Sequence, residues 1–311
     1  MSRRLLQPIR ALVPGKDEWI VVPDGFLFFL PLESLPSGEV GKTLLETTTV
    51  SYEFASRFVG GMEGLAGTTS HMPEKVLAFA PFAGGGTAHQ QGPGGFSPLP
   101  ASREEISGLA GLEGREYIDS AATKERFLSE INKYPIVHLA THAVSSINDA
   151  AGSYIAFYPQ HGSAMEDHLF LEELYGLDMH ATQLVIMSAC ETGQGELVNN
   201  EGVISLARAF AYAGCASTIS SLWKADDQAT SFILRRFYVY LEKGYTKSRA
   251  LRQAKLDYLG SDAVNKSPAY WSHLILMGNA DPVYTKRHSW LLLLLLLLPL
   301  GSIWWWFFRK T

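Results

Sequence analysis

Two short apolar runs, each ending in a reactive side chain, constrain the fold of this chain more than any other feature. Residues 184–195 read LVIMSACETGQG, an apolar run that leads to Cys190 and then to a glycine-containing turn. Residues 136–141 read IVHLAT and are followed directly by His142. Near-continuous apolar runs of this length are typical of parallel strands that are buried on both faces. The pattern therefore predicts two strands of an α/β sheet that end at a cysteine and at a histidine.

The two reactive side chains are expected to meet if the strands are neighbours. Parallel strands end at the same edge of a sheet, and α/β proteins keep their sites in the loops beyond that edge. A thiol becomes a nucleophile near neutral pH when a base lies beside it, and histidine is the usual base. We therefore predict a dyad of Cys190 and His142. The alternative for Cys190 is a buried, unreactive small hydrophobic residue.

Two other residues resemble the dyad members but are expected to be structural. His138 lies four residues before His142, on the same face of the predicted strand, and is expected to be a packed core histidine. The pair predicts no zinc site, because the zinc motif with this spacing needs a helix and a glutamate. Cys215, in a Gly-Cys-Ala-Ser run after a predicted helix, is expected to pack in the core.

Composition excludes several classes of function. The chain has 311 residues and a net charge of −5, so it can bury a large core but offers no basic field for nucleic acid. Its 2 cysteines form no Cys-x-x-Cys motif, which argues against a disulfide framework or a zinc knuckle and favours a reducing compartment. We expect no metal and no organic cofactor.

Residues 290–308 read WLLLLLLLLPLGSIWWWFF and carry no charge. A helix of this length spans a hydrocarbon core of about 30 Å, and tryptophans suit its two interfaces. The N-terminal residues show no continuous apolar stretch of the kind found in a signal peptide. The sequence thus predicts a single-pass C-terminal anchor in the cell inner membrane, with the rest of the chain in the cytoplasm. The alternative is a buried core helix.

Strands and helices alternate along the chain, which favours an α/β sheet with parallel central strands. Asp24-Gly25 between two apolar runs predicts a hairpin. Ser102 and Glu105 form a capping-box pattern, which predicts a helix to about residue 112. The glycine-rich residues 82–100 predict a long mobile loop, without the Gly-Lys-Ser/Thr run of a phosphate site. Further strands are expected at 19–23, 26–30, 43–52, 76–80, 117–118, 154–158, 217–222 and 273–277, and further helices at 123–131, 170–175, 201–213, 226–243 and 247–259.

Several runs, in this order, resemble the CHAT family of caspase-like cysteine peptidases. They are IVHLATH, MSACETGQG and NEGVISLARAFAYAGCASTISSLWKADDQAT, with PDGFLFFLPLESL, PLPASREEI and YWSHLILMG in support. The resemblance implies a caspase-like three-layer sandwich with a mostly parallel central sheet over residues 1–280, followed by a juxtamembrane linker at 281–289 and the membrane helix at 290–308. It also implies that His142 is the base and Cys190 the nucleophile.

The resemblance implies further site residues. The backbone N–H groups of Ala143 and Cys190 are expected to bind the oxyanion. The family usually has glycine where this chain has Ala143, so a site that needs a positive φ there would be weakened. In separases a Leu-Trp-x-x-x-Asp run carries the aspartate that binds the arginine at P1, and that spacing selects Asp227. The alternative role for Asp226 and Asp227 is helix capping.

Together these features predict a membrane-anchored cytoplasmic cysteine endopeptidase that cleaves protein substrates after a basic P1 residue. The resemblance suggests a role in bacterial defence or programmed cell death. Many members of the family carry tetratricopeptide repeats and no repeat is evident here, so a regulator is expected to be a separate protein or the membrane. The alternative is a catalytically weak or inactive scaffold that binds partner proteins at the membrane.

Overall fold

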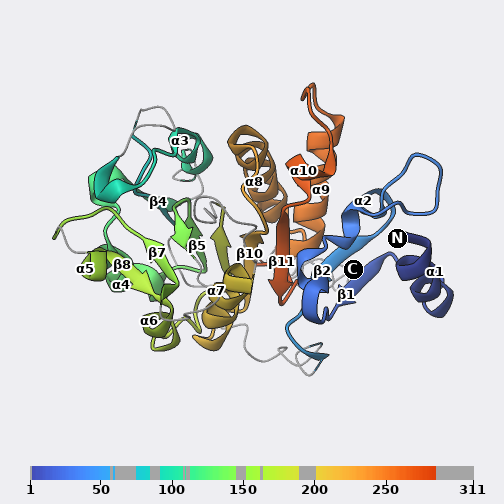
Figure 1. Cartoon of the computed structure of the whole chain (residues 1–311), viewed down its shortest axis with the longest axis horizontal. Coiled ribbons are helices and arrows are strands. Elements are labelled where there is room, and N and C mark those ends of the chain that lie inside the picture. The colour runs from blue at the N-terminus through green and yellow to red at the C-terminus, as the bar shows by residue number, and fades with distance from the viewer. Residues whose placement is uncertain are drawn as a thin grey trace, which may run out of the picture.

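The computed structural model of the chain describes residues 2–56, 59, 75–84, 92–107, 109, 113–144, 152–161, 164–188 and 201–284. Eight strands within these ranges form one sheet (Figure 1). All neighbouring strands in it are parallel except one pair, β10 and β11. In spatial order the strands are β1 (Glu18–Val21), β2 (Thr49–Tyr52), β11 (Leu274–Gly278), β10 (Ser217–Ser221), β9 (Leu184–Met187), β5 (Ile136–Leu139), β3 (Val76–Ala80) and β4 (Gly114–Ile118).

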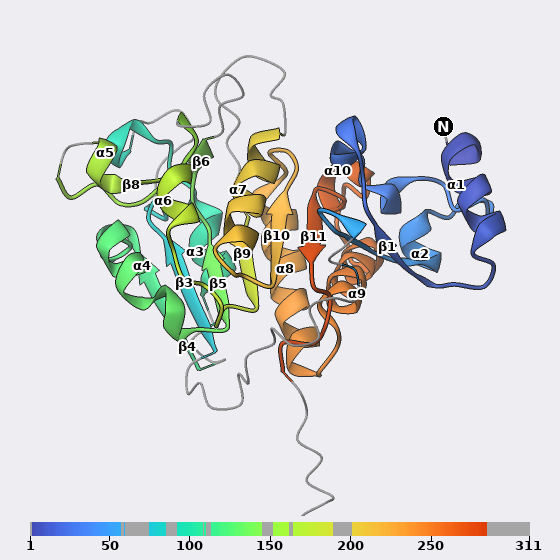
Figure 2. The same cartoon turned by 90° about the horizontal axis from the view of Figure 1, so that it is seen from below.

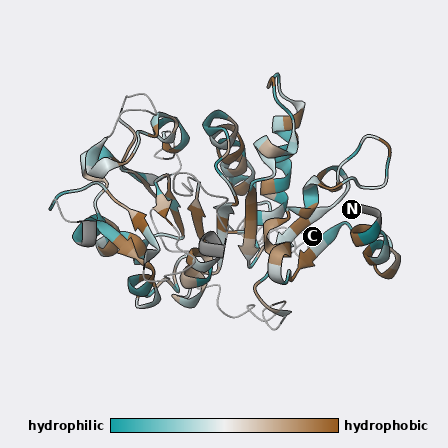
Figure 3. Cartoon of the chain, in the orientation of Figure 1, coloured by the Kyte–Doolittle hydropathy of each residue, from teal (hydrophilic) through white to brown (hydrophobic). Residues whose placement is uncertain are grey.

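Helices cover both faces of this sheet, and Figure 1 shows them on its two sides. The core on one face joins strand residues such as Val76 and Ile186 to α3 (Pro100–Ile106), α8 (Asp227–Glu242) and α9 (Lys247–Gly260). The core on the other face joins strand residues such as Phe79 and Met187 to α4 (Lys124–Glu130), α6 (Leu171–Tyr175) and α7 (Glu201–Tyr212). Figure 3 shows the apolar residues concentrated on the central strands, as burial on both faces requires. The predicted α/β architecture with a mostly parallel sheet is therefore confirmed.

A second, smaller sheet follows His142 directly. It consists of the antiparallel strands β6 (Ala143–Val144), β7 (Tyr154–Ala156) and β8 (His168–Phe170), with α5 (Ala164–Asp167) before β8. Figure 2 shows it beside the β3–β4 end of the main sheet. Its first strand continues the chain from the predicted catalytic histidine, so the small sheet helps to set the position of that residue.

The predicted hairpin at Asp24-Gly25 is wrong. Gly25–Phe29 forms a 3₁₀ helix instead of a strand, in which the Leu27 N–H donates to the Asp24 carbonyl. The partner of β1 is β2, in parallel, so a strand at residues 26–30 would have no place beside it. Phe28 packs into the core, and the guanidinium of Arg208 lies 5.2 Å from the centre of its ring.

Two further predicted elements differ from the structure. Within the predicted strand 43–52, only Thr49–Tyr52 is a strand, because Thr43 and Glu46 form a capping box that starts α2 (Leu44–Thr47). The predicted capping box of Ser102 and Glu105 is also wrong. Helix α3 begins at Pro100, the Ser102 hydroxyl donates to the Leu99 carbonyl over 2.6 Å, and Glu105 is buried against another element.

Most other predicted elements are confirmed, and 76–80 matches β3 residue for residue. No helix within the described ranges is long and apolar enough to cross a membrane, and the predicted anchor at 290–308 lies outside those ranges. The remaining elements are α1 (Ser2–Leu12), α10 (Pro268–Trp271) and short 3₁₀ helices at Leu32–Ser34, Pro93–Gly95, Asp119–Ala121 and Ile131–Lys133.

Candidate active site

The sheet register brings the ends of β5 and β9 together. Leu139 pairs with Met187, and the Ser188 N–H donates to the Leu139 carbonyl over 3.3 Å. His142 and Cys190 each follow the last paired residue of their strand by three positions. Cys190 itself lies outside the described residues, so the dyad stays a prediction. The register shows that the two strands are parallel neighbours and that their last paired residues are directly opposite each other, as the dyad requires.

The imidazole of His142 is fully buried, and its neighbours include Phe82 and residues of the segment 92–99. Its Nε2 lies 2.7 Å from the backbone oxygen of Ser97. The ring of Phe96 stacks on it at 5.1 Å between centroids and 17° between planes, and Phe82 lies at 5.0 Å. The described part of the loop that was predicted to be mobile is thus packed over the histidine, and Leu99 N–H donates to the Phe82 carbonyl.

The contact with Ser97 determines which nitrogen of His142 carries the proton. A carbonyl oxygen can only accept a hydrogen bond, so Nε2 must be the donor. In the neutral imidazole the other nitrogen, Nδ1, is then the basic one. The segment 96–97 therefore orients the ring and leaves Nδ1 as the acceptor nitrogen of the neutral imidazole.

Sequence reasoning missed Ser97, Phe96 and Phe82. The role of Ser97 belongs to its carbonyl group, which every amino acid has, so no side-chain pattern could have indicated it. The two phenylalanines border a glycine-rich stretch, and their apolar side chains in such a loop were the available signal that part of it packs.

Ala143 occupies a conformation that suits alanine. Within the described residues, the non-glycine residues with positive φ are Glu113 and Asp119, so Ala143 has an ordinary φ. It pairs with Ile155 of β7, and the Ala156 N–H donates to the His142 carbonyl over 2.9 Å. In an antiparallel ladder this bond makes Ala143 and Ile155 a non-hydrogen-bonded pair, whose N–H groups point away from the partner strand. The Ala143 N–H is thus directed away from β7.

His138 is a packed core histidine, as predicted. It is fully buried, its Nε2 lies 2.6 Å from Oε1 of Glu105, and its Nδ1 lies 2.9 Å from the hydroxyl of Tyr238. These two bonds tie β5 to α3 and to α8, which cover the same face of the sheet. The strand that ends near His142 is therefore anchored to both of these helices.

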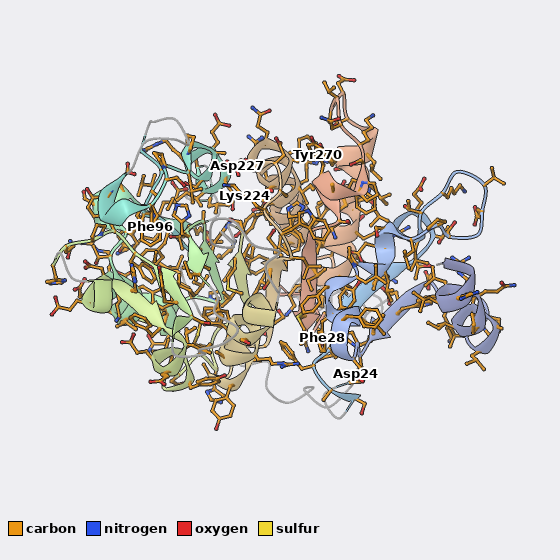
Figure 4. All side chains as sticks on the ribbon, in the orientation of Figure 1. Asp24, Phe28, Phe96, Lys224, Asp227 and Tyr270 are labelled. Atoms are coloured by element: carbon orange, nitrogen blue, oxygen red, sulfur yellow. The ribbon has the colours of Figure 1, made fainter. Side chains whose placement is uncertain are left out.

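Asp227 lies at the same edge of the sheet, beyond the carboxyl end of β10, because β10, β9 and β5 are parallel. It is exposed and is the first residue of α8, and Figure 4 shows it close to Lys224. Asp226 accepts a hydrogen bond from the Ala229 N–H over 2.9 Å, which confirms its predicted capping role. The preceding turn is held by Trp223, whose indole N–H donates to the Ala269 carbonyl over 3.0 Å.

Cys215 lies in the core, as predicted. Burial raises the pKa of its thiol to about 11, and its Sγ lies 3.2 Å from the Ser217 carbonyl oxygen. Such a thiol is neutral near pH 7 and unreactive. Of the 2 cysteines in the chain, Cys190 is therefore the remaining candidate for a nucleophile.

Comparison with solved structures agrees with this fold. The chain is similar to the Saccharomyces cerevisiae separase–securin complex, with a TM-score of 0.53 and 8% identity over 84% of this chain and 15% of that one. It is also similar to the complex of Porphyromonas gingivalis RgpB pro- and mature domains, with a TM-score of 0.55 and 11% identity over 91% of this chain and 70% of that one. The chain thus has the α/β fold of caspase-like cysteine peptidases.

The CHAT domain model matches residues 1–279, so the chain belongs to the CHAT domain family. Among curated proteins it is 27% identical over 215 residues to human tetratricopeptide repeat protein 28 and 25% identical to the mouse protein. Each match covers 59% of this chain and 9% of the relative. The chain therefore spans only a small part of the length of these relatives.

Proposed function

We propose that this chain is a cysteine endopeptidase in which His142 is the base and Cys190 the nucleophile. One observation carries the proposal: β5 and β9 are parallel neighbours in register, and the Ser97 carbonyl leaves Nδ1 of His142 as its basic nitrogen. Membership of the CHAT domain family and the caspase-like fold support the same reaction class.

The reaction would run in two steps. Nδ1 of His142 takes the proton of the Cys190 thiol, and the thiolate attacks the scissile carbonyl carbon. The oxyanion is bound by the backbone N–H groups of Cys190 and Ala143, and one such donor is typically worth about 3 kcal/mol of barrier. The C–N bond then breaks, and the amine leaves with the proton from His142. Water, losing a proton to His142, hydrolyses the thioester, which releases the acid and restores the thiol.

Asp227 is the proposed recognition residue for a basic P1 side chain. Its exposed carboxylate stands at the edge of the sheet that holds His142, on a turn that Asp226 and Trp223 keep in place. A carboxylate can pair bidentately with a guanidinium, which favours arginine at P1. Replacement by asparagine should lower kcat/KM for an arginine substrate far more than for a substrate with an uncharged P1 residue.

We further propose that residues 290–308 anchor the enzyme in the inner membrane with residues 1–280 in the cytoplasm. Anchoring would raise the local concentration of substrates held near the same bilayer. The separase neighbour was solved in complex with securin, and a separate protein partner is proposed for this chain as well. A role in bacterial defence is the proposed setting. The fraction of full-length chain that sediments with inner-membrane vesicles, compared with a chain ending at residue 289, tests the anchor.

The test of the catalytic proposal is hydrolysis of a fluorogenic peptide with arginine at P1 by the full chain. Cys190→Ala and His142→Ala should each abolish turnover, and Cys215→Ala, the matched control, should leave turnover intact. Wild-type turnover in His142→Ala would overturn the dyad.

A scaffold that binds partner proteins is the second candidate, and complete burial of the His142 ring favours it. A thiol-directed probe separates the two. Labelling of Cys190 that is lost in His142→Ala supports the peptidase, and labelling that is equal in both proteins supports the scaffold.

A further inference from the structure

A groove of about 490 Å³ lies on the face of the sheet that α3, α8 and α9 cover, beside the turn that carries Asp226 and Asp227. Its walls come from α3, from α8, from the end of α9 with the loop that follows it, and from α10. Figure 1 shows these helices on one side of the sheet, and Figure 4 shows Tyr270 on the same side as Lys224 and Asp227. The groove thus adjoins the proposed P1 recognition site.

The lining combines aromatic rings with carboxylates. Phe232, Tyr258 and Tyr270 supply the rings. The Tyr258 hydroxyl donates to the Asn265 carbonyl over 2.8 Å, and the Asn265 amide donates to the Tyr270 hydroxyl over 3.1 Å, which holds that wall in shape. The charged groups of the lining are three carboxylates and one guanidinium: Glu104, Asp226, Asp262 and Arg235.

The hydroxyl of Ser231 is the second, independent sign of a ligand. Ser231 lines the groove and is 2% exposed, and its Oγ has no hydrogen-bond partner within the described part of the chain. Buried polar atoms in native proteins are paired in the great majority of cases. A hydroxyl without a protein partner at the wall of a groove is available to pair with a polar group of a bound molecule.

We infer that this groove binds a lysine- or arginine-containing segment of the substrate polypeptide, outside the residues next to the scissile bond. Cationic side chains are attracted to the faces of tyrosine and phenylalanine rings and to carboxylates, and the groove offers both. A polar group of the same segment would pair with Ser231. An acidic peptide or a nucleic acid would meet three carboxylates and one guanidinium, which disfavours both. That the bound polypeptide is a substrate rests on the proposed function.

The binding test uses the full chain carrying Cys190→Ala and Asp227→Asn, so that neither cleavage nor P1 recognition contributes. The probe is a fluorescein-labelled peptide with three lysines in a glycine–serine background, and the comparison peptide has glutamates in their place. Glu104→Gln and Asp262→Asn should each weaken binding by up to about fivefold, the upper end for exposed charge pairs. Asp178→Asn, which removes an exposed carboxylate on the other face of the sheet, should leave binding unchanged. Equal binding of the two peptides would overturn the inference.

Ser231→Ala separates a binding role from a structural one. The hydroxyl has no partner to lose, so its removal should leave the melting temperature unchanged or raise it. The same variant should weaken binding of the lysine peptide. A variant that binds as tightly as the parent would show that Ser231 contacts no ligand, and would remove the observation that distinguishes the groove from a solvated acidic surface.

A kinetic test keeps this inference apart from the proposed function. With Cys190 and Asp227 intact, one substrate is a short peptide with arginine at P1, and the other adds a lysine segment. Asp262→Asn should raise KM for the long substrate and leave kcat/KM of the short one unchanged. If both substrates are cleaved and Asp262→Asn changes the kinetics of neither, the inference about the groove is wrong and the proposed function stands. If neither substrate is cleaved, the proposed function fails and the binding test still decides the groove.

Discussion

A buried ion pair between Glu33 and Lys255 joins the N-terminal part of the chain to the sheet. The Lys255 ammonium lies 2.8 Å from Oε1 of Glu33 and 2.6 Å from the Leu274 carbonyl oxygen. The hydroxyl of Tyr52 donates to Oε2 of Glu33 over 2.9 Å and accepts from the Leu32 N–H over 2.8 Å. The side chains of Lys255 and Glu33 are 2% and 6% exposed. Water cannot replace either partner without local opening.

Glu33→Gln should therefore be strongly destabilising. The amide has nearly the shape of the carboxylate but no charge, so the ammonium would stay buried with neutral partners only. Removing one member of a buried pair in this way costs about 3–5 kcal/mol. At roughly 2–4 °C per kcal/mol for a domain of this size, the melting temperature should fall by roughly 10 °C.

The assay is urea and thermal denaturation of the full chain, followed by circular dichroism under identical detergent conditions. Glu39→Gln is the matched control, because Glu39 also pairs with a lysine, Lys42, but the two side chains are 54% and 50% exposed. The urea and thermal unfolding midpoints of Glu39→Gln should stay close to those of the wild type. Replacing both buried partners, Glu33→Leu with Lys255→Met, should recover part of the loss, since no buried charge remains. If Glu33→Gln shifts the unfolding midpoint no more than Glu39→Gln does, the claim that breaking the buried Glu33–Lys255 pair is strongly destabilising is wrong.

Three other predictions follow from the site and its surroundings. Ala143→Gly should leave kcat/KM for an arginine substrate within about twofold, because φ at Ala143 needs no glycine; a gain of tenfold or more would show strain there. Iodoacetamide at pH 7.5 should label Cys190 but not Cys215 in the native chain and both in urea, as peptide mass spectrometry would report, because burial raises the Cys215 pKa to about 11. Burial lowers the pKa of His273 from 6.5 to about 3. The unfolded chain therefore binds a proton at this residue below pH 6.5, and the folded chain does not. Stability that is present above pH 6.5 is thus lost as the pH falls. Between pH 7 and pH 5 the free energy of unfolding, measured by urea titration, should fall by about 2 kcal/mol less in His273→Gln than in the wild type. An equal fall in both proteins would contradict this.

Sequence patterns predicted those elements whose residues reveal them locally. Residues 76–80 are five apolar residues in a row, and every one of them is fully buried in β3, so a strand covered on both faces was the direct interpretation. The predicted helices at 123–131 and 226–243 begin at Thr123 and Asp226, and the side chains of both residues cap α4 and α8 through bonds to neighbours in the sequence.

Patterns failed where distant partners decided the outcome. Asp24-Gly25 is a strong local turn signal, but β1 pairs with β2, so the residues after the turn had no strand to join. Glu105 stands at the right spacing for a capping box, yet its carboxylate bonds His138, 33 residues further along the chain. The position of β11 between β2 and β10 likewise depends on pairings that the residues of 273–277 do not encode by themselves.

In the candidate site too, some residues could be predicted from the sequence and others could not. His142 could be predicted because an imidazole is chemically distinctive and because it follows an apolar strand, and the register of β5 with β9 then supports its pairing with Cys190. What orients His142 is the Ser97 carbonyl and the faces of Phe96 and Phe82, and these reach it from a loop that is rich in glycine and proline. A carbonyl acts through its position alone, so this part of the site is a property of the fold. The tautomer and the orientation of His142 therefore depend on how residues 92–99 pack, so a substitution that displaces this segment would change them without altering either member of the proposed dyad.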